Sequence, residues 1–163
     1  MPGFKVGLSL GSNIGDKAAN ILRAMQLLAA DRQVRVVKMS QLYRTAPWGP
    51  VAQDFFANAC ALVTTRLAPL DLLAHAKAVE AAMGREQTER WGPRLIDIDL
   101  LYYSDLTLHD QRLALPHPEL FNRAFVLVPL AAIAPGLQIG GQSVAQAAKA
   151  MAGQGVVPWD GAG

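Results

Sequence analysis

Apolar residues recur along the chain with two different periods, and these predict strands and helices. From Phe4 to Leu10 every second residue is apolar, which is the period of a strand with one buried face. From Ile21 to Leu28 the apolar positions recur at helical spacing. The same analysis of the whole chain predicts strands over 4–11, 34–43, 56–65 and 95–103, helices over 16–30 and 69–83, then a short strand over 125–128 and a last helix over 143–151.

Turn-forming and capping residues support these boundaries. Asp16 places a negative charge at the start of the first helix, and Pro69 fits the first turn of the second. Gly84 suits a left-handed helix C-terminus, and Ser143 suits the N-cap of the last helix. The order β-α-β-β-α-β is the split pattern of ferredoxin-like sheets. We therefore expect one α+β domain over 1–163, with a ferredoxin-like βαββαβ core, an added C-terminal strand and helix, and a mainly antiparallel sheet covered by helices.

Composition narrows the class of protein. Of the 163 residues, 52% are hydrophobic and 17% are charged, which indicates a folded chain. A formal net charge of +2 is too balanced for a dedicated nucleic-acid binder. Cys60 is the only cysteine, so an intramolecular disulfide and a zinc site of paired cysteines are both excluded. The most apolar stretch, 124–137, contains two prolines and is too short to span a bilayer. We expect a cytoplasmic monomer that binds neither nucleic acid nor membrane.

The densest chemistry lies where an arginine-rich segment leads into a strand. The run Arg90-Trp91-Gly92-Pro93-Arg94 is followed by Asp97 and Asp99. Strand side chains alternate, so the two aspartates share one face, with Cα atoms roughly 6.5–7 Å apart at a rise of about 3.3 Å per residue. An Asp-x-Asp pair alone is more often solvated on an outer face. The neighbouring arginines favour a magnesium site instead, since Mg²⁺ takes one or two carboxylates and completes its shell with water and phosphate oxygens.

Other polar positions suggest a second binding region. Asn58 lies within an apolar strand, where its amide either bonds backbone at a strand end or recognises a flat heterocycle stacked between Phe56 and Phe125. A lone histidine is more often structural than catalytic, but His117 lies between prolines and near arginines, which suits phosphate contact. The segment 11–16 lacks the ending of a P-loop and is predicted to be a tight turn without catalysis.

Together these motifs resemble the 6-hydroxymethyl-7,8-dihydropterin pyrophosphokinases of folate biosynthesis. The most specific match is the Arg-Trp-Gly-Pro-Arg run followed by Asp-x-Asp. The matching segments occur in family order and cover nearly the whole chain: Leu10-Gly11-Ser12-Asn13, Tyr43-Arg44-Thr45, Gly49-Pro50, Asn58-Ala59, Gly84-Arg85, the run 90–94, Asp97-Ile98-Asp99, Pro116-His117 and Asn122-Arg123-Ala124-Phe125.

The resemblance implies an ATP- and Mg²⁺-dependent enzyme that moves the terminal diphosphate of ATP to the pterin hydroxymethyl oxygen and releases AMP. Asp97 and Asp99 would coordinate two Mg²⁺ ions, and Arg85 and Arg94 would stabilise the group in transfer. No protein nucleophile is required, so positioning and charge neutralisation are the main catalytic contributions. ATP binding is implied for Lys77, Glu80, Arg90, Trp91, Ile98, Leu100, Arg112, His117 and Arg123. Pterin binding is implied for Thr45, Ala46, Trp48, Phe56, Asn58, Asp97 and Phe125.

Two other classes remain as alternatives. A ferredoxin-like RNA-binding module would display aromatic residues on its sheet and a basic surface, but two carboxylates on a sheet face would repel a nucleic-acid backbone. An ordinary kinase or a nucleotidyltransferase could also use paired acids. The nucleotide product separates a kinase from a pyrophosphokinase, since the first releases ADP and the second AMP.

Overall fold

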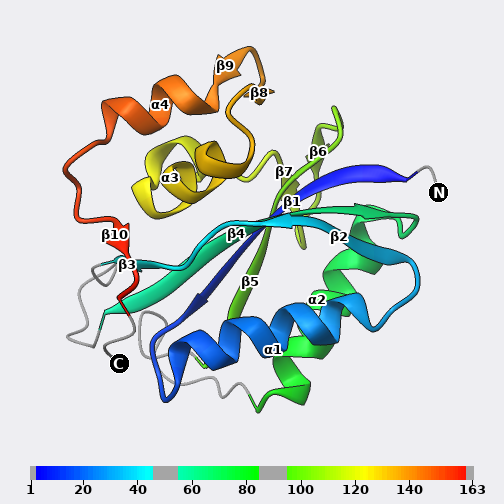
Figure 1. Cartoon of the computed structure of the whole chain (residues 1–163). Coiled ribbons are helices and arrows are strands. Elements are labelled where there is room, and N and C mark those ends of the chain that lie inside the picture. The colour runs from blue at the N-terminus through cyan, green and yellow to red at the C-terminus, as the bar shows by residue number, and fades with distance from the viewer. Residues whose placement is uncertain (1–2, 46–54, 85–94, 161–163) are drawn as a thin grey trace.

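The computed structural model describes residues 3–45, 55–84 and 95–160 of the chain. Helices α1 and α2 cover one face of a central sheet, and α3 and α4 lie on the other (Figure 1). The main elements are β1 Phe4–Ser12, α1 Lys17–Ala29, β2 Val34–Met39, β3 Tyr43–Thr45, β4 Phe56–Thr65, α2 Pro69–Ala82, β5 Asp97–Tyr103, α3 Ala124–Ile133, α4 Val144–Ala150 and β10 Val157–Pro158. The smaller ones are β6 Leu108–His109, β7 Ala114–Leu115, the 3-10 helix η1 Leu120–Asn122, β8 Gln138–Ile139 and β9 Gln142–Ser143.

The central sheet of the described residues has six strands in the order β10-β3-β4-β1-β5, with β2 also paired to β4. Every pair in this sheet is antiparallel. The two central strands, β4 and β1, are paired from Phe4↔Thr65 to Ser12↔Ala57. This arrangement confirms the predicted α+β class, its mainly antiparallel sheet and the covering helices.

The predicted strand over 34–43 is in fact two strands, β2 and β3, which pair with successive parts of β4. The chain leaves the regular ladder around Ser40. There the Ser40 hydroxyl accepts a hydrogen bond from the backbone N–H of Cys60 at 3.0 Å and donates to the carbonyl of Gln41 at 2.8 Å. The Ser40 side chain thus takes the place of a backbone acceptor for the Cys60 N–H. The next strand, β3, begins at Tyr43.

The predicted strand over 125–128 is wrong, because these residues belong to helix α3. A short apolar run fits a buried helix as well as a buried strand, and periodicity alone does not separate the two. Pro129 lies inside this helix, although a proline there removes one backbone hydrogen bond. Nearly all of α3 is apolar, and the helix packs between β4 and α4. This burial outweighs the cost of the hydrogen bond lost at Pro129.

The predicted helix ends agree with the structure. The Asp16 carboxylate caps α1 by accepting from the backbone N–H of Ala19 at 3.1 Å. The Ser143 hydroxyl caps α4 by accepting from Gln146 at 3.2 Å. Gly84 has a φ of +78°, the left-handed conformation that a residue with a Cβ adopts only at a cost.

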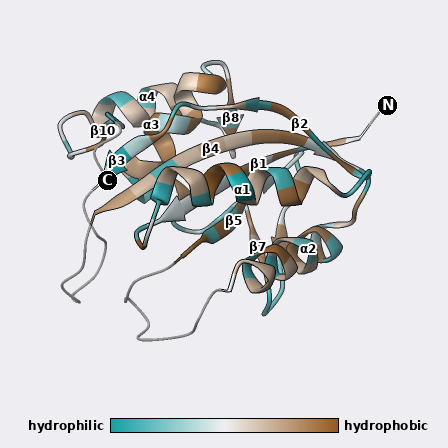
Figure 2. Cartoon of the chain, turned by 60° about the horizontal axis from the view of Figure 1, so that its bottom comes forward, coloured by the Kyte–Doolittle hydropathy of each residue, from teal (hydrophilic) through white to brown (hydrophobic). Residues whose placement is uncertain are grey.

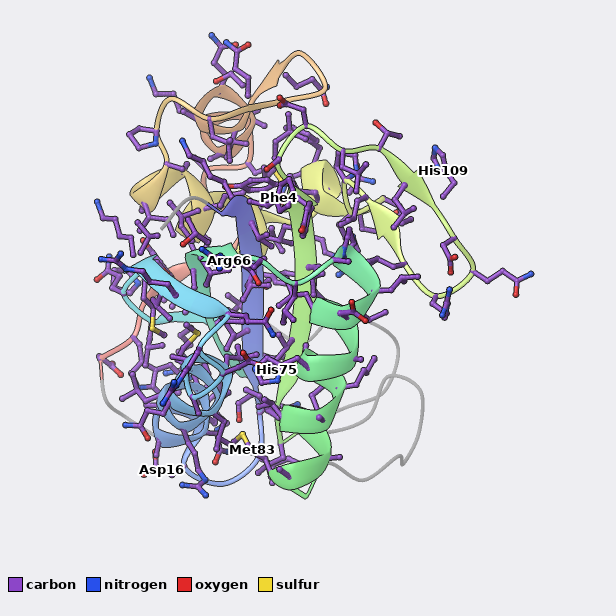
Figure 3. All side chains as sticks on the ribbon, turned by 90° about the vertical axis from the view of Figure 1, so that its right-hand side faces the viewer. Phe4, Asp16, Arg66, His75, Met83 and His109 are labelled. Atoms are coloured by element: carbon purple, nitrogen blue, oxygen red, sulfur yellow. The ribbon has the colours of Figure 1, made fainter. Side chains whose placement is uncertain are left out.

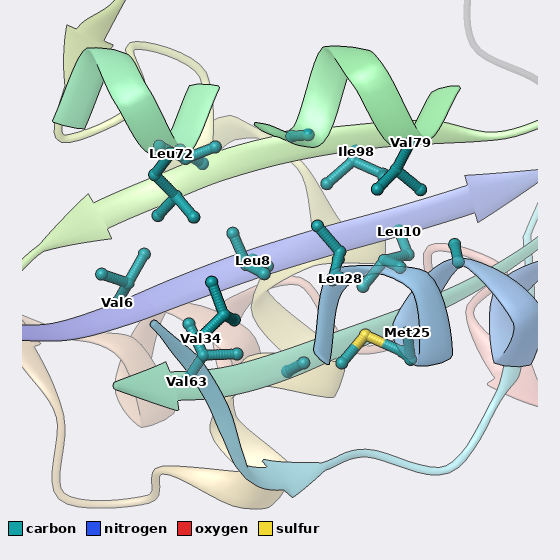
Figure 4. Packing of buried hydrophobic residues seen from close by; sticks show 14 of the residues in the cluster. Val6, Leu8, Leu10, Met25, Leu28, Val34, Val63, Leu72, Val79 and Ile98 are labelled. Carbon is teal, nitrogen blue, oxygen red and sulfur yellow. The ribbon is translucent and has the colours of Figure 1, made fainter. Parts of the chain in front are cut away.

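Two apolar cores lie on the two faces of the sheet. Figure 4 shows the larger one, in which Met25 of α1 and Leu72 of α2 point toward Leu8 and Leu10 of β1. Each of these leucines is at most 1% exposed, which contributes about 1.5–3 kcal/mol of transfer free energy per side chain. Mostly apolar residues follow β4, whereas polar and apolar residues alternate along α1 (Figure 2). Within the described ranges, no helix is both long and apolar enough to cross a membrane.

Candidate active site

The two aspartates lie on the face of β5 that is turned away from α1 and α2. Ile98 and Leu100, which alternate with them, are buried in the core formed with those helices. Asp97 pairs with Gly11 and Asp99 with Ser9 on β1, and both carboxylates are half-buried. The shared face expected from strand periodicity is therefore present.

A row of paired residues connects this carboxylate pair to Asn58 on β4. Asn58 pairs with Gly11, and Gly11 pairs with Asp97, so the three stand side by side across neighbouring strands. At a strand spacing of about 4.8 Å, the backbones of Asn58 and Asp97 lie roughly 10 Å apart. A Cβ at Gly11 would lie only 2.8 Å from Asn58 Oδ1, so the absence of a side chain there keeps open the space between amide and carboxylate.

The Asn58 side chain is held in one orientation. Its Nδ2 donates to Thr45 Oγ1 at 2.5 Å, and both residues are 4% exposed. Thr45 pairs with Phe56, two positions along the β3–β4 ladder from the pair formed by Tyr43 and Asn58, and Phe56 is half-buried. The hydrogen bond to Thr45 uses one amide hydrogen and leaves Oδ1 directed toward the gap beside Gly11.

Glu80 reaches β5 from the opposite side, at the point between the two aspartates. Its Oε2 accepts the backbone N–H of Ile98 at 2.9 Å, and the residue is 4% exposed. Lys77 lies one turn earlier on α2, with its Nζ 3.7 Å from Glu80 Oε1. Since β5 ends the order of paired strands in the sheet, this carboxylate satisfies an edge N–H that the β1–β5 ladder does not use.

His117 follows the short strand β7 and lies near Asp99. Its backbone N–H donates to Leu101 O at 2.8 Å, and its ring Nδ1 accepts from the backbone N–H of Glu119 at 3.0 Å. Burial lowers the pKa of the imidazole below its usual range and the positive charge of Arg123 lowers it further, against the opposing effect of Asp99. The neutral ring therefore carries its proton on Nε2, as a hydrogen-bond donor.

Arg123 and Phe125 stand at the start of α3. The guanidinium carbon of Arg123 is 5.6 Å from the centre of the Phe125 ring, and both side chains are half-buried. Arg112 instead lies on the exposed hairpin of β6 and β7, which projects away from the sheet near His109 (Figure 3). There it makes an ion pair with Asp110, Nε to Oδ1 at 3.0 Å, which holds the pKa of that carboxyl below its usual range.

Some predicted site residues are not placed by these contacts. The side chains of Ile98 and Leu100 face the α1–α2 core, so only their backbones are available to a nucleotide on the aspartate face. Six further residues lie outside the described residues: Ala46, Trp48, Arg85, Arg90, Trp91 and Arg94.

The sequence prediction missed the small residues of β1 that lie between the candidate pterin and metal residues. Gly7, Ser9 and Gly11 alternate with Val6, Leu8 and Leu10 on β1, and this pattern of small residues on one face was the available signal. The predicted first strand ends at Gly11, and the role of this glycine between Asn58 and Asp97 was not predicted.

The donor set suits magnesium. Two half-buried carboxylates share one face, and the described parts of the chain contain no cluster of three or more acidic, histidine or cysteine side chains that could enclose an ion. Mg²⁺ is commonly bound by one or two carboxylates with water and phosphate oxygens as its other ligands, so Asp97 and Asp99 fit a shared metal–phosphate site.

Residues 7–135 match the family model of 7,8-dihydro-6-hydroxymethylpterin-pyrophosphokinase, HPPK. The chain belongs to the HPPK family. It is 54% identical over 140 residues to the 2-amino-4-hydroxy-6-hydroxymethyldihydropteridine pyrophosphokinase of Methylorubrum extorquens, covering 86% of this chain and 89% of that protein. It is 44% identical over 123 residues to the bifunctional protein FolKE of Lactococcus lactis, covering 76% of this chain but 35% of the larger protein.

Solved structures support the HPPK fold. The Plasmodium falciparum HPPK-DHPS wild type with SDX-DHP superposes with a TM-score of 0.74 at 16% identity, covering 91% of this chain and 44% of that one. At that identity the likeness concerns the fold alone. The chain spans less than half of these two-part relatives, and the functions of their remaining parts are not carried over.

Proposed function

We propose that this HPPK family member transfers the diphosphate of ATP to the hydroxymethyl group of 6-hydroxymethyl-7,8-dihydropterin and releases AMP, as a step of folate biosynthesis. The observation that carries the proposal is the row Asn58–Gly11–Asp97 across three paired strands. An amide suited to a heterocycle and a carboxylate suited to a metal lie roughly 10 Å apart, at two strand spacings, with a glycine at the paired position between them.

On the phosphate side, Asp97 and Asp99 would hold Mg²⁺ between the sheet and the ATP phosphates. Bound there, Mg²⁺ supplies positive charge that offsets the charge on the transferring group. The number of two ions rests on the family resemblance. His117 contributes a neutral Nε2–H donor near Asp99, and Arg123 contributes a cation at the start of α3. Both can bind phosphate oxygens without adding a negative charge to the site.

On the acceptor side, Asn58 would bond the edge of the pterin. Thr45 holds the amide through its hydrogen bond to Nδ2, so that Oδ1 would accept from ring N–H groups, and Phe56 and Phe125 would stack on the two ring faces. An amide preset by a buried partner loses little side-chain entropy on binding. The roles of Ala46 and Trp48 rest on the resemblance.

The acceptor hydroxyl itself is the proposed nucleophile. Cys60, which pairs with Ser9 on this face, is fully buried, and burial raises the pKa of its thiol well above the ordinary value. Its Sγ donates to the carbonyl of Val126. A thiol in that state is not suited to nucleophilic attack, because the thiolate is the reactive form. Positioning of the two substrates is then the main contribution of the protein.

The remaining assignments are proposals from the resemblance. They comprise stabilisation of the transferring group by Arg85 and Arg94, and ATP contacts by Lys77, Glu80, Arg90, Trp91, Ile98, Leu100 and Arg112. A monomeric state, a cytoplasmic location and the absence of nucleic-acid and membrane binding stay predictions.

Product analysis tests the proposal. The protein is incubated with ATP, Mg²⁺ and the hydroxymethyl dihydropterin, and the nucleotides are separated. AMP formed only in the presence of the pterin is the expected product, and ADP as the product would refute diphosphate transfer and support an ordinary kinase.

Isosteric variants test the metal site. Asp97→Asn and Asp99→Asn should each lower turnover by roughly 100-fold or more, because the charge stabilisation by a bound metal is worth several kcal/mol. The matched control is Asp105→Asn, an exposed aspartate just after β5. Mn²⁺ binding followed by electron paramagnetic resonance should weaken in the first two variants and not in the control. Unchanged Mn²⁺ binding and turnover in either site variant would remove that aspartate from the metal site.

A further inference from the structure

The C-terminal part of the chain returns to the sheet beside the acceptor side of the site. After α4 the chain runs to β10, which pairs with β3 on the edge that β4 does not use (Figure 1). Val157 pairs with Arg44 and Pro158 with Tyr43. The backbone N–H of Trp159 then donates to Leu42 O at 2.9 Å. These residues lie beyond the range 7–135 that matches the family model.

Trp159 anchors this segment through Phe55. The two rings have centroids 5.9 Å apart and are tilted by 55°, a favourable aromatic pair. Two cations also approach the Phe55 ring. Arg44 Cζ is 3.7 Å and Lys17 Nζ 4.4 Å from its centre, both within the range of cation–π attraction. Phe55 thus contacts Trp159, Arg44 of β3 and Lys17, the first residue of α1.

This cluster is directly connected to the residues that would bind the pterin. Phe55 precedes Phe56 in the chain, and Arg44 precedes Thr45. Strand β3 is only three residues long and pairs with β4 through three residue pairs, one of which is Thr45↔Phe56. A strand this short has few bonds of its own, so the second ladder that β10 adds restricts its motion substantially.

The segment between α4 and β10 is exposed over residues 152–155. Residues 151–154 and Val156 line a cavity of about 520 Å³, whose other walls are Tyr43 and side chains of α3 and α4. The pairing of β10 with β3 and the Trp159–Phe55 contact fix its far end.

We propose that β10 and Trp159 form a C-terminal clamp that positions Thr45, Phe56 and Asn58 and so sets the affinity for the pterin rather than for ATP. The inference rests on the proposed function, which places the pterin on these three residues. Trp159 acts as a positioning residue, because its contacts among the described residues are with Phe55, with the backbone of Leu42 and with the α1–α2 core.

Steady-state kinetics of Trp159→Ala test the clamp. KM for the pterin should rise by roughly 3- to 10-fold, the size expected for the loss of an aromatic pair and its packing. KM for ATP should stay within about twofold of the value of the unmodified protein, because the substitution weakens binding of the pterin and not binding of ATP. Trp159→Phe keeps an aromatic ring against Phe55 and should restore the pterin KM. Val157→Ala is the matched control, because the Val157 side chain is exposed and the substitution keeps the β10 backbone.

Backbone hydrogen exchange gives a second readout that does not need turnover. In Trp159→Ala, amides of the β3–β4 ladder should exchange faster, whereas those of the β1–β5 ladder should not change. Should Trp159→Ala not fold, Trp159→Leu retains apolar bulk without the aromatic pair and is expected to show the same split.

Several results would overturn the clamp. These are an equal rise of both KM values, a lower melting temperature with both KM values unchanged, or unaltered exchange of the β3–β4 amides. Failure of the proposed function looks different, because the unmodified protein would then form no pterin-dependent AMP. In that case faster β3–β4 exchange would still support positioning by Trp159, and direct titration with the pterin would decide its effect on affinity.

Discussion

Replacing Glu80 by alanine should remove the hydrogen bond that joins α2 to β5 at Ile98, between the two aspartates. The substitution leaves the N–H of Ile98 without its acceptor, and Ile98 is 3% exposed, so water does not readily take the acceptor's place. A hydrogen bond to a charged group contributes about 1.5–3 kcal/mol. The Lys77 ion pair adds about 0.5 kcal/mol at most, because the Lys77 side chain is 59% exposed and screened by solvent.

The expected loss in the free energy of unfolding is therefore about 2–3 kcal/mol for Glu80→Ala. Glu80→Gln keeps an oxygen acceptor and loses only the charge, so it should cost about 1 kcal/mol. Lys77→Ala is the matched control and should cost within about 0.5 kcal/mol. Urea unfolding of the three variants measures these differences through the shift of the midpoint at constant slope.

Metal-binding and kinetic measurements distinguish two roles for Glu80, a hydrogen bond to the Ile98 backbone and a contact with the nucleotide. If Glu80 acts by fixing the Ile98 backbone, Glu80→Ala should weaken Mn²⁺ binding at Asp97 and Asp99 and speed exchange of the Ile98 amide. A higher KM for ATP with unchanged stability and unchanged Mn²⁺ binding would refute this reasoning and favour the nucleotide role implied by the family resemblance. A Lys77→Ala loss as large as that of Glu80→Ala would instead show that the ion pair dominates.

Two further predictions concern titratable groups on the sheet face that carries the aspartates. Because the folded state lowers the pKa of His117, the unfolded chain takes up its proton first as the pH falls, and the metal-free protein should lose stability below a pH of about 6.5. The urea midpoint of His117→Asn should fall less steeply with pH than that of the unmodified protein, and parallel pH profiles of the two midpoints would contradict this. Cys60 should resist alkylation in the native protein and react once unfolded, as followed by mass spectrometry, because burial keeps its thiol protonated; rapid native modification would show that the core over β4 opens.

The sequence predicted the elements whose apolar period is long and whose ends are marked. The strand predicted over 56–65 matches β4, and the helix over 16–30 differs from α1 by one residue at each end. Prediction failed at 125–128, where four apolar residues carry no period and α3 is stabilised by α4 and η1, which a local pattern does not reveal.

The same division applies to the site. The shared face of Asp97 and Asp99 follows from the alternation along one strand, so it was predictable. The row from Asn58 to Asp97 depends on the register of three strands, and a shift by one residue would place Gly11 beside neither. The bond from Glu80 to Ile98 likewise requires α2 to lie against β5, which only the folded chain shows.

Strand β5 shows how one sheet face serves both the site and the core. Asp97 and Asp99 occupy its first part, while Leu101 and Tyr102 on the same face are buried against α3. Two consecutive residues share that face because the register with β1 shifts between Gly7 and Leu8. Gly7 permits the shift, since a Cβ at that position would overlap the Tyr102 ring. The irregularity thus places the apolar contact with α3 after Asp99 in the strand. The two carboxylates therefore lie beside the part of the sheet that α3 covers, on a backbone that the packed core holds in place.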